Sequence, residues 1–340
     1  MTIDFVPKED ALKIIQRLRD NPKASIPPTE LNFKGVSLRG EDLKGLNLVG
    51  ACFVEADLSG ADLSGAHLFK ADFSKASLVN AILNDIELTG ANLSEANLED
   101  ARAERAGLGM ATMTKTRLFN AVLTDATLTK ADLTEADLRH AKLNRVRLRD
   151  AVLHKADCTG ADFRGADMSL SKFTGATMIN ADMRDARLRL VKGYEEAKWY
   201  GVDIRDINFA GAYRLRRFIM DENYLKEFRD ESEFNHMVYN VWSITSDCGR
   251  SLNRWCLWVL GIIIIFSVFY SFCGIDYGKY DNWIGPFYYS VVTITTLGYG
   301  DIVPATPVAR VITICEVCIG YIMLGGLLSI FTNKMARRGD

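Results

Sequence analysis

The sequence lacks the residue sets on which most enzymes depend. Its 340 residues include only four histidines, which are scattered along the chain, and no recognisable nucleophile motif, metal-ligand set or phosphate-binding loop. We therefore expect no catalytic residues, no enzymatic activity and no organic cofactor. The seven cysteines form no extracellular cluster, and we interpret them as reduced thiols.

A signal peptide is also missing. Residues 1–30 are polar and lack the apolar core that such a peptide needs, so the part of the chain that follows them is expected to stay in the cytoplasm. A voltage-sensor span with regularly spaced arginines is absent as well, because residues 213–254 contain no apolar segment long enough to cross a bilayer.

Charge is absent from one long segment near the C-terminus. Residues 255–275 carry no charged side chain and are long enough to cross a hydrocarbon core of roughly 30 Å. A second apolar segment, 311–331, is interrupted only by Glu316. The chain is therefore predicted to be a soluble part followed by two membrane spans.

Basic residues indicate the orientation of these spans. Arg250 and Arg254 precede the first span, and Arg337 and Arg338 follow the second. The positive-inside bias then predicts a multi-pass protein of the cell (inner) membrane with both termini in the cytoplasm.

A five-residue period fills the soluble part. From residue 31 to 190 the chain divides into 32 consecutive blocks of five, whose middle residue is Leu in 21 blocks. The first residue is Ala in 24 of the 28 blocks between 51 and 190. A period of five fits neither an amphipathic helix nor a strand, so the chain must turn a corner in every block. Four blocks with their four corners close one coil, and eight stacked coils would stand about 38 Å tall.

Blocks such as ADLSG (61–65) and ANLSE (91–95) resemble the A(D/N)Lxx pattern of the pentapeptide-repeat family. The resemblance extends from residue 31 to 190 and implies a right-handed quadrilateral β-helix. We expect this β-helix to occupy residues 31–212, with an N-terminal helix and cap in 1–30. After residue 190 the register slips by one, which predicts an irregular last coil near Ala212.

The charge of the repeats argues against one known role of this family. Members that mimic duplex DNA need a strongly acidic face, but residues 31–190 hold 22 acidic and 21 basic residues. We therefore expect no nucleic-acid mimicry and no nucleic-acid partner. Residues 101–190 nevertheless hold 16 bases against 11 acids. This basic half either faces anionic cytoplasmic lipids or is an ordinary solvated surface, and both alternatives stay open.

The segment between the two spans contains Thr-Leu-Gly-Tyr-Gly-Asp at 296–301, which resembles the selectivity filter of potassium channels, usually TVGYGD. In such a filter, carbonyl oxygens and one threonine hydroxyl replace the hydration shell of K⁺, and glycines supply the alternating backbone hand that aligns them. Leu297 replaces the more frequent Val. The residues that the resemblance implies for K⁺ binding are Thr296, Leu297, Gly298, Tyr299 and Gly300.

The resemblance implies a tetrameric, potassium-selective pore built from two-transmembrane subunits in the lipid bilayer, with the repeats in a regulatory or assembly role. A non-selective cation channel and a membrane-tethered scaffold with a vestigial filter are the alternatives. The gating ligand or cytoplasmic partner is unknown. The expected parts are a helical linker at 213–254 and a pore domain at 255–340, with an outer helix at 255–275, a pore helix at 283–295, the filter at 296–301 and an inner helix at 307–332.

Four residues would support the filter. Tyr288 and Tyr289 occupy the positions of an aromatic cuff, although plain interfacial aromatics would look similar. Thr295 precedes the filter and Asp301 ends it. Gly320 lies in the inner helix, where the resembling channels carry a gating-hinge glycine, and is expected to be either such a hinge or a close-packing contact.

Glu316 is the only acid within an apolar span. A lone ionisable group at that depth is costly unless it is paired or faces water. We expect its carboxyl to hydrogen-bond a hydroxyl or backbone group from residues 290–295 or from a neighbouring subunit. The alternative is a carboxylate that faces the pore cavity and concentrates cations.

Overall fold

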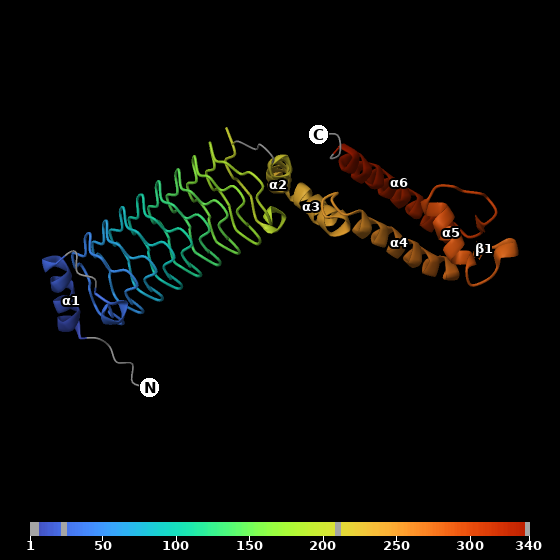
Figure 1. Ribbon diagram of the computed structural model, residues 1–340. Helices are drawn as coiled ribbons and strands as arrows, with labels where there is room; N and C mark the ends of the chain where they lie inside the picture. The colour runs from blue at the N-terminus through green and yellow to red at the C-terminus, as the bar shows by residue number, and fades with distance from the viewer. Residues whose placement is uncertain (1–6, 22–25, 208–211, 337–340) are drawn as a thin grey trace. The chain divides into compact units, whose positions relative to one another are not determined.

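The blocks of five residues form the four sides of a square β-helix. The computed structural model describes residues 7–21, 26–207 and 212–336, and the chain divides into two compact units, Met1–Lys226 and Glu227–Asp340. Figure 1 shows the stacked coils of the first unit and the helices of the second. The helices and short strands are α1 (Lys8–Asp20), η1 (Pro28–Glu30), η2 (Tyr194–Glu196), α2 (Tyr213–Glu231), α3 (Glu233–Ser246), α4 (Leu252–Phe272), β1 (Ile275–Asp276), η3 (Gly278–Tyr280), α5 (Gly285–Ile294), β2 (Val303–Pro304) and α6 (Pro307–Ala336).

Each block makes its turn through a left-handed residue. The fifth residue of all 32 blocks has φ between 53° and 70°, and 22 of these residues are not glycine. Residues with a Cβ atom avoid this backbone conformation, so other interactions must stabilise it. Coil-to-coil hydrogen bonds supply that stabilisation, as where the Lys115 N–H donates to the Thr134 carbonyl at 2.8 Å.

Each coil pairs with the next through parallel bridges, such as the bridge between Asp57 and Ser77. The Leu58 N–H donates to the Ser77 carbonyl at 2.7 Å, and the Ser77 N–H donates to the Ala56 carbonyl at 2.8 Å. The middle side chain of every block is buried. The large middle residues therefore stack into one continuous core, in which the Phe53 ring lies 4.8 Å from Phe33 and 4.7 Å from Phe73.

The last coil contains one extra residue. Lys172 pairs with Lys192 at the regular spacing, whereas Thr177 pairs with Lys198 and not with Ala197. The insertion lies at η2, which agrees with the register slip predicted after residue 190. The end of the coil was predicted near Ala212, and residues 208–211 just before it lie outside the described residues.

Both ends of the β-helix core are covered by helices. Ala11, Ile15 and Leu18 of α1 join the core at the N-terminal end, and Leu215 and Ile219 of α2 join it near the last coil. A solenoid needs such caps because an open end would expose the apolar core to water.

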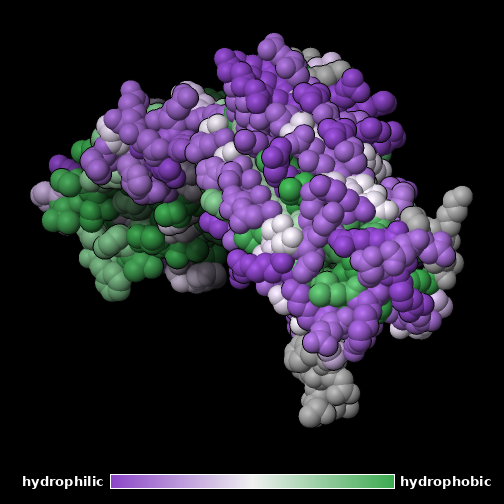
Figure 2. All heavy atoms as spheres, turned by 90° about the vertical axis from the view of Figure 1, so that its left-hand side faces the viewer, coloured by the Kyte–Doolittle hydropathy of each residue, from purple (hydrophilic) through white to green (hydrophobic). Residues whose placement is uncertain are grey.

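The second unit is helical. α3 ends at three left-handed residues, Asp247 to Gly249, and α4 begins after Ser251, whose hydroxyl accepts the Arg254 N–H. α4 and α6 are each long and apolar enough to cross a membrane, and most of their residues are exposed in a single chain. Figure 2 shows extended hydrophobic areas beside hydrophilic ones on the molecular surface.

The helix limits differ slightly from the expected ones. α4 begins and ends three residues before the predicted 255–275, because Ser251 caps its start and the left-handed Gly274 follows its end. α5 begins at Gly285 and not at 283, since the Asn282 side chain accepts the Ile284 and Gly285 N–H groups. α6 continues to Ala336, four residues beyond the predicted end.

Phe53→Ala should destabilise the β-helix by about 3–5 kcal/mol, because it empties the centre of the aromatic stack. Phe69→Ala is the matched control, since Phe69 is 40% exposed on the same solenoid and its loss should cost less than about 0.5 kcal/mol. The measurement is the denaturant midpoint of the far-ultraviolet circular dichroism signal. Equal shifts for the two variants would contradict the stacked core.

Candidate functional site

The segment 296–300 begins where α5 ends and stays attached to that end. The Thr296 N–H donates to the Thr293 carbonyl at 3.0 Å, and the Leu297 N–H donates to the Val292 carbonyl at 3.1 Å. The Thr295 hydroxyl donates to the Val291 carbonyl at 2.6 Å. Thr295 therefore belongs to the C-terminal turn of α5, and the helix fixes the start of the segment.

Residues with left-handed backbone conformation alternate with residues of ordinary conformation along this segment. Thr296, Gly298 and Gly300 have φ of 57°, 52° and 75°, whereas Leu297 and Tyr299 between them are not left-handed. Alternation of this kind turns successive carbonyl groups to the same side of the strand. The two glycines adopt the left-handed conformation without penalty, but Thr296 is β-branched and is strained there.

A hydrogen bond ties the far end of the segment to α5. The Tyr288 hydroxyl donates to the Asp301 carboxylate at 2.8 Å. The segment is thus held at both ends by the same short helix. Tyr289 instead points into the core of the unit, where its ring lies 4.8 Å from Tyr270 and its hydroxyl is 3.2 Å from the Thr313 hydroxyl.

Glu316 is completely buried within one chain and links three helices. Its carboxylate accepts a hydrogen bond from the Tyr270 hydroxyl of α4 at 2.5 Å and a short one from the Ser290 hydroxyl of α5. Ser290 is the first residue of the segment in which the sequence predicted a partner. A carboxylate that faces the pore cavity is ruled out, because Glu316 has no exposed surface even in a single chain.

The Ser290 hydroxyl has two acceptors for one proton. It lies 3.1 Å from the Ile263 carbonyl of α4 as well as next to Glu316. An amide in place of the carboxylate could donate to this hydroxyl and still accept from Tyr270, so every polar group would keep a partner. An alanine would leave two buried hydroxyls with fewer partners.

Gly320 contacts the end of α5. A Cβ atom at this position would overlap the Ile294 carbonyl, so only glycine lets α6 approach the turn from which the segment 296–300 starts. α6 is an unbroken helix at this point. The structure therefore gives Gly320 a close-packing contact, and its role as a hinge stays a prediction.

Tyr270 is the functional residue that the sequence reasoning missed. It lies in a different span from Glu316 and is almost fully buried. A signal for it existed, since a tyrosine inside an apolar span offers a hydroxyl to a lone acid in another span. The spacing of the two residues gave no indication that they meet.

Several large side chains of this unit are mostly exposed in a single chain. Leu297 is 57% exposed and Tyr299 is 66% exposed. Exposed apolar side chains also line α6.

Two protein families match the chain. Residues 255–337 match the family described as "Ion channel", and residues between 29 and 189 match eight copies of the family described as "Pentapeptide repeats". A solved structure of HetL, a pentapeptide repeat protein from the cyanobacterium Nostoc sp. Strain PCC 7120, has 25% sequence identity. That likeness covers 58% of this chain and 92% of HetL, with a TM-score of 0.45.

Two curated relatives are plant proteins. Two-pore potassium channel 4 of Arabidopsis thaliana is 36% identical over 87 residues, which cover 23% of this chain and 31% of that protein. Two pore potassium channel c of Oryza sativa subsp. japonica is 48% identical over 46 residues, which cover 12% of this chain and 10% of that protein. The chain spans less than a third of the length of these relatives. In this chain, a segment that matches pentapeptide repeats precedes a segment that matches an ion-channel domain.

Proposed function

We propose that the chain is one subunit of a potassium-selective channel that conducts K⁺ passively across the membrane. The alternating hand of residues 296–300 carries this proposal. It occurs between two helices that are long and apolar enough to span a membrane, directly after a short helix that anchors it. Such alternation costs energy at Thr296 and suits few tasks other than aligning carbonyl groups.

Selectivity would rest on backbone oxygens. The carbonyl groups of Thr296, Leu297, Gly298 and Tyr299, with the Thr296 hydroxyl, would replace the water around a permeating K⁺ ion. The Tyr288–Asp301 hydrogen bond and the packing of Tyr289 would keep this strand in place. The potassium channels among the relatives support K⁺ as the permeant ion.

A ring of carbonyl oxygens requires several chains around one axis. One chain supplies one strand, and the Leu297 and Tyr299 side chains are 57% and 66% exposed in the single chain. We propose a homotetramer, in which four strands surround the ion path. Both termini would lie in the cytoplasm of the cell, with the β-helix there as a regulatory or assembly domain.

Potassium should permeate and sodium should not. In proteoliposomes with opposed K⁺ and Na⁺ gradients, the current should reverse near the K⁺ equilibrium potential. A reversal potential between those of the two ions would favour the non-selective cation channel, and no flux at all would favour the scaffold with a vestigial filter.

The backbone hand can be tested by the same measurement. Gly298→Ala should lower conductance at least about tenfold, because each chain of the ring would carry a left-handed alanine that costs about 1–2 kcal/mol. Gly261→Ala is the control, since Gly261 lies within α4 with open space around it and should conduct normally. Unchanged K⁺ conductance in Gly298→Ala would refute the proposed filter.

Glu316→Gln should assemble and conduct nearly as the natural protein does, because an amide can satisfy Tyr270 and Ser290. Glu316→Ala should lower the thermal stability of the assembled pore by about 2–4 kcal/mol in equivalent free energy, since it leaves both hydroxyls short of a partner and creates a cavity. Native mass spectrometry and flux test Glu316→Gln, and a thermal unfolding curve of the purified pore tests Glu316→Ala. A large loss of conductance in Glu316→Gln with assembly intact would contradict the structural role.

The repeats should be dispensable for permeation. A truncated chain that begins at 232 keeps α3, which packs on α4, and should form a tetramer that conducts K⁺ with an altered open probability. A chain that begins at 247 loses α3 and tests whether that helix supports the pore. If the first truncation fails to form tetramers in native mass spectrometry, the β-helix or α2 is an assembly element and the regulatory role is wrong.

A further inference from the structure

One side of the β-helix differs from the others in charge. We name as side four the blocks that begin at residue 46 and at every twentieth residue up to 186, and as side three the blocks that begin at 41 and at every twentieth residue up to 181, with 202–206 in the last coil. Side four carries six basic and three acidic residues. Side three carries an excess of acids over its first eight blocks.

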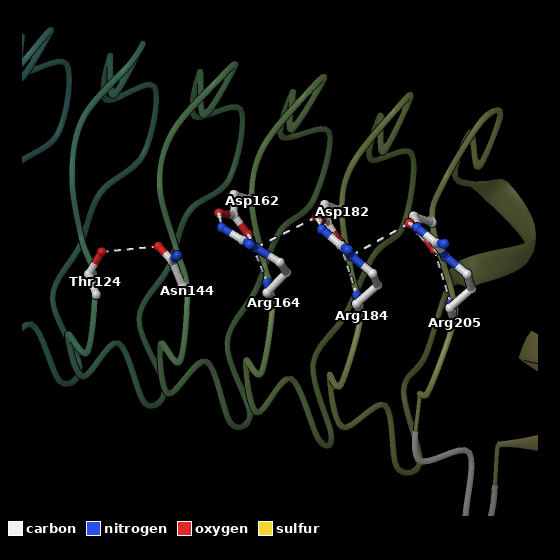
Figure 3. Close-up of polar contacts among 8 residues, drawn as sticks. Thr124, Asn144, Asp162, Arg164, Asp182, Arg184 and Arg205 are labelled. Carbon is white, nitrogen blue, oxygen red and sulfur yellow. Dashed lines mark hydrogen bonds and ion pairs between the residues drawn. The ribbon is translucent and has the colours of Figure 1, made fainter.

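The arginines of side three form ion pairs with neighbouring carboxylates. Figure 3 shows Asp162 with Arg164, Asp182 with Arg184, and Arg205 in a row along this side. Each guanidinium lies 2.6–2.7 Å from the aspartate two residues before it, and those of Arg164 and Arg184 also lie 3.6 Å from the aspartate of the next coil. The hydrogen bond between Asp203 and Arg205 lowers the pKa of Asp203 to about 2. Side three therefore presents little free positive charge.

The arginines of side four form no ion pairs of this kind within residues 26–207, although the charge of Arg147 contributes to the lowered pKa of Asp125. Arg147, Arg149, Arg187 and Arg189 are all exposed, and none of them has an ion pair or a side-chain hydrogen bond within residues 26–207. Asp167, which lies on the coil between the two pairs, accepts the Ser169 N–H instead. Four guanidinium groups thus face outward from one flat side with their hydrogen-bond donors available.

Exposed apolar side chains gather on the same side. Four of the large hydrophobic residues that are exposed on the described part of the β-helix lie on side four: Val49, Phe69, Met110 and Leu190. The remaining one, Phe119, lies on side two, whose blocks begin at residue 36 and at every twentieth residue up to 176. A solvated surface has no need to combine unpaired arginines with exposed apolar groups on one side.

We propose that side four of the β-helix binds the anionic lipid surface of the bilayer that contains α4 and α6. Basic and apolar side chains on one face are the combination that attracts a protein to anionic headgroups and inserts at their boundary. Residues 207–251 join the last coil to the first span, so the bilayer is always within reach of the chain.

A second copy of the chain fits side four less well. The acidic side chains that could complement its arginines include those of side three, and several of these are already engaged by arginines of their own side. Lipid phosphates carry unpaired negative charge and need no matching register. The inference requires only that α4 and α6 lie in a membrane, and it would stand even if the pore did not conduct.

Photo-crosslinking in proteoliposomes tests the proposal with the full chain. Leu190 is replaced by the photoreactive residue benzoylphenylalanine, and Phe119 on side two receives the same residue as the control. Vesicles of phosphatidylcholine with and without phosphatidylglycerol are illuminated, and lipid adducts are identified by mass spectrometry. We expect adducts at 190 only in vesicles that contain phosphatidylglycerol, and fewer adducts at high salt because salt screens the headgroup charge.

Charge reversal provides a second measurement. Arg187→Glu with Arg189→Glu should lower adduct formation at 190 at least about tenfold. Arg117→Glu with Lys172→Glu changes the net charge equally at exposed residues away from side four and should leave it unchanged. Circular dichroism would check that both variants are folded. The comparison of the two lipid compositions uses no charge variant, so it tests the proposal even if a charge variant does not fold.

Three results would overturn the proposal. Lipid adducts at 190 that are equally frequent without phosphatidylglycerol would show that headgroup charge is not recognised. Adducts that are equally frequent at 119 would show that side four has no preference for lipid. Crosslinks from 190 to a second copy of the chain, in place of lipid, would make side four an interface between subunits.

Discussion

The need to satisfy every main-chain polar group governs both parts of this protein. In the β-helix the backbone N–H and carbonyl groups of each coil form hydrogen bonds with those of the next coil. These bonds let 22 non-glycine residues adopt a left-handed conformation that is unfavourable for residues with a side chain. In the membrane unit the helices satisfy their own backbone. The segment 296–300 is the exception, because its alternating backbone conformation leaves carbonyl groups without hydrogen-bond donors among the described residues. In the proposed channel, a bound ion would contact these carbonyl groups in place of water.

The membrane unit is held together around that segment by contacts behind it. Glu316 joins α4, α5 and α6 through two hydroxyl groups, and Gly320, one turn later, brings α6 against the end of α5. A movement of α6 at this level would disturb the helix from which the segment 296–300 starts. The same contacts that stabilise the fold therefore connect the position of the inner helix with the geometry of the strand.

The β-helix carries arginines that form ion pairs on side three and, among the described residues, arginines that form none on side four. Along side three, aspartates and arginines of the same coil and of adjacent coils form a row of ion pairs whose charges cancel locally. On side four the arginines of alternate coils form no ion pair within residues 26–207. A solenoid can make this distinction because each side repeats at a fixed spacing, so that a change of residue type in one column alters one side only.

The sequence by itself determined the features that depend on local spacing. These are the five-residue period, the two apolar spans and the glycines of the filter motif, since each follows from how neighbouring residues can be arranged. Only the tertiary structure decided that Tyr270 meets Glu316, that Gly320 has no room for a side chain, and which arginines are paired. These facts depend on side chains brought together from distant segments, and packing, not periodicity, fixes such contacts.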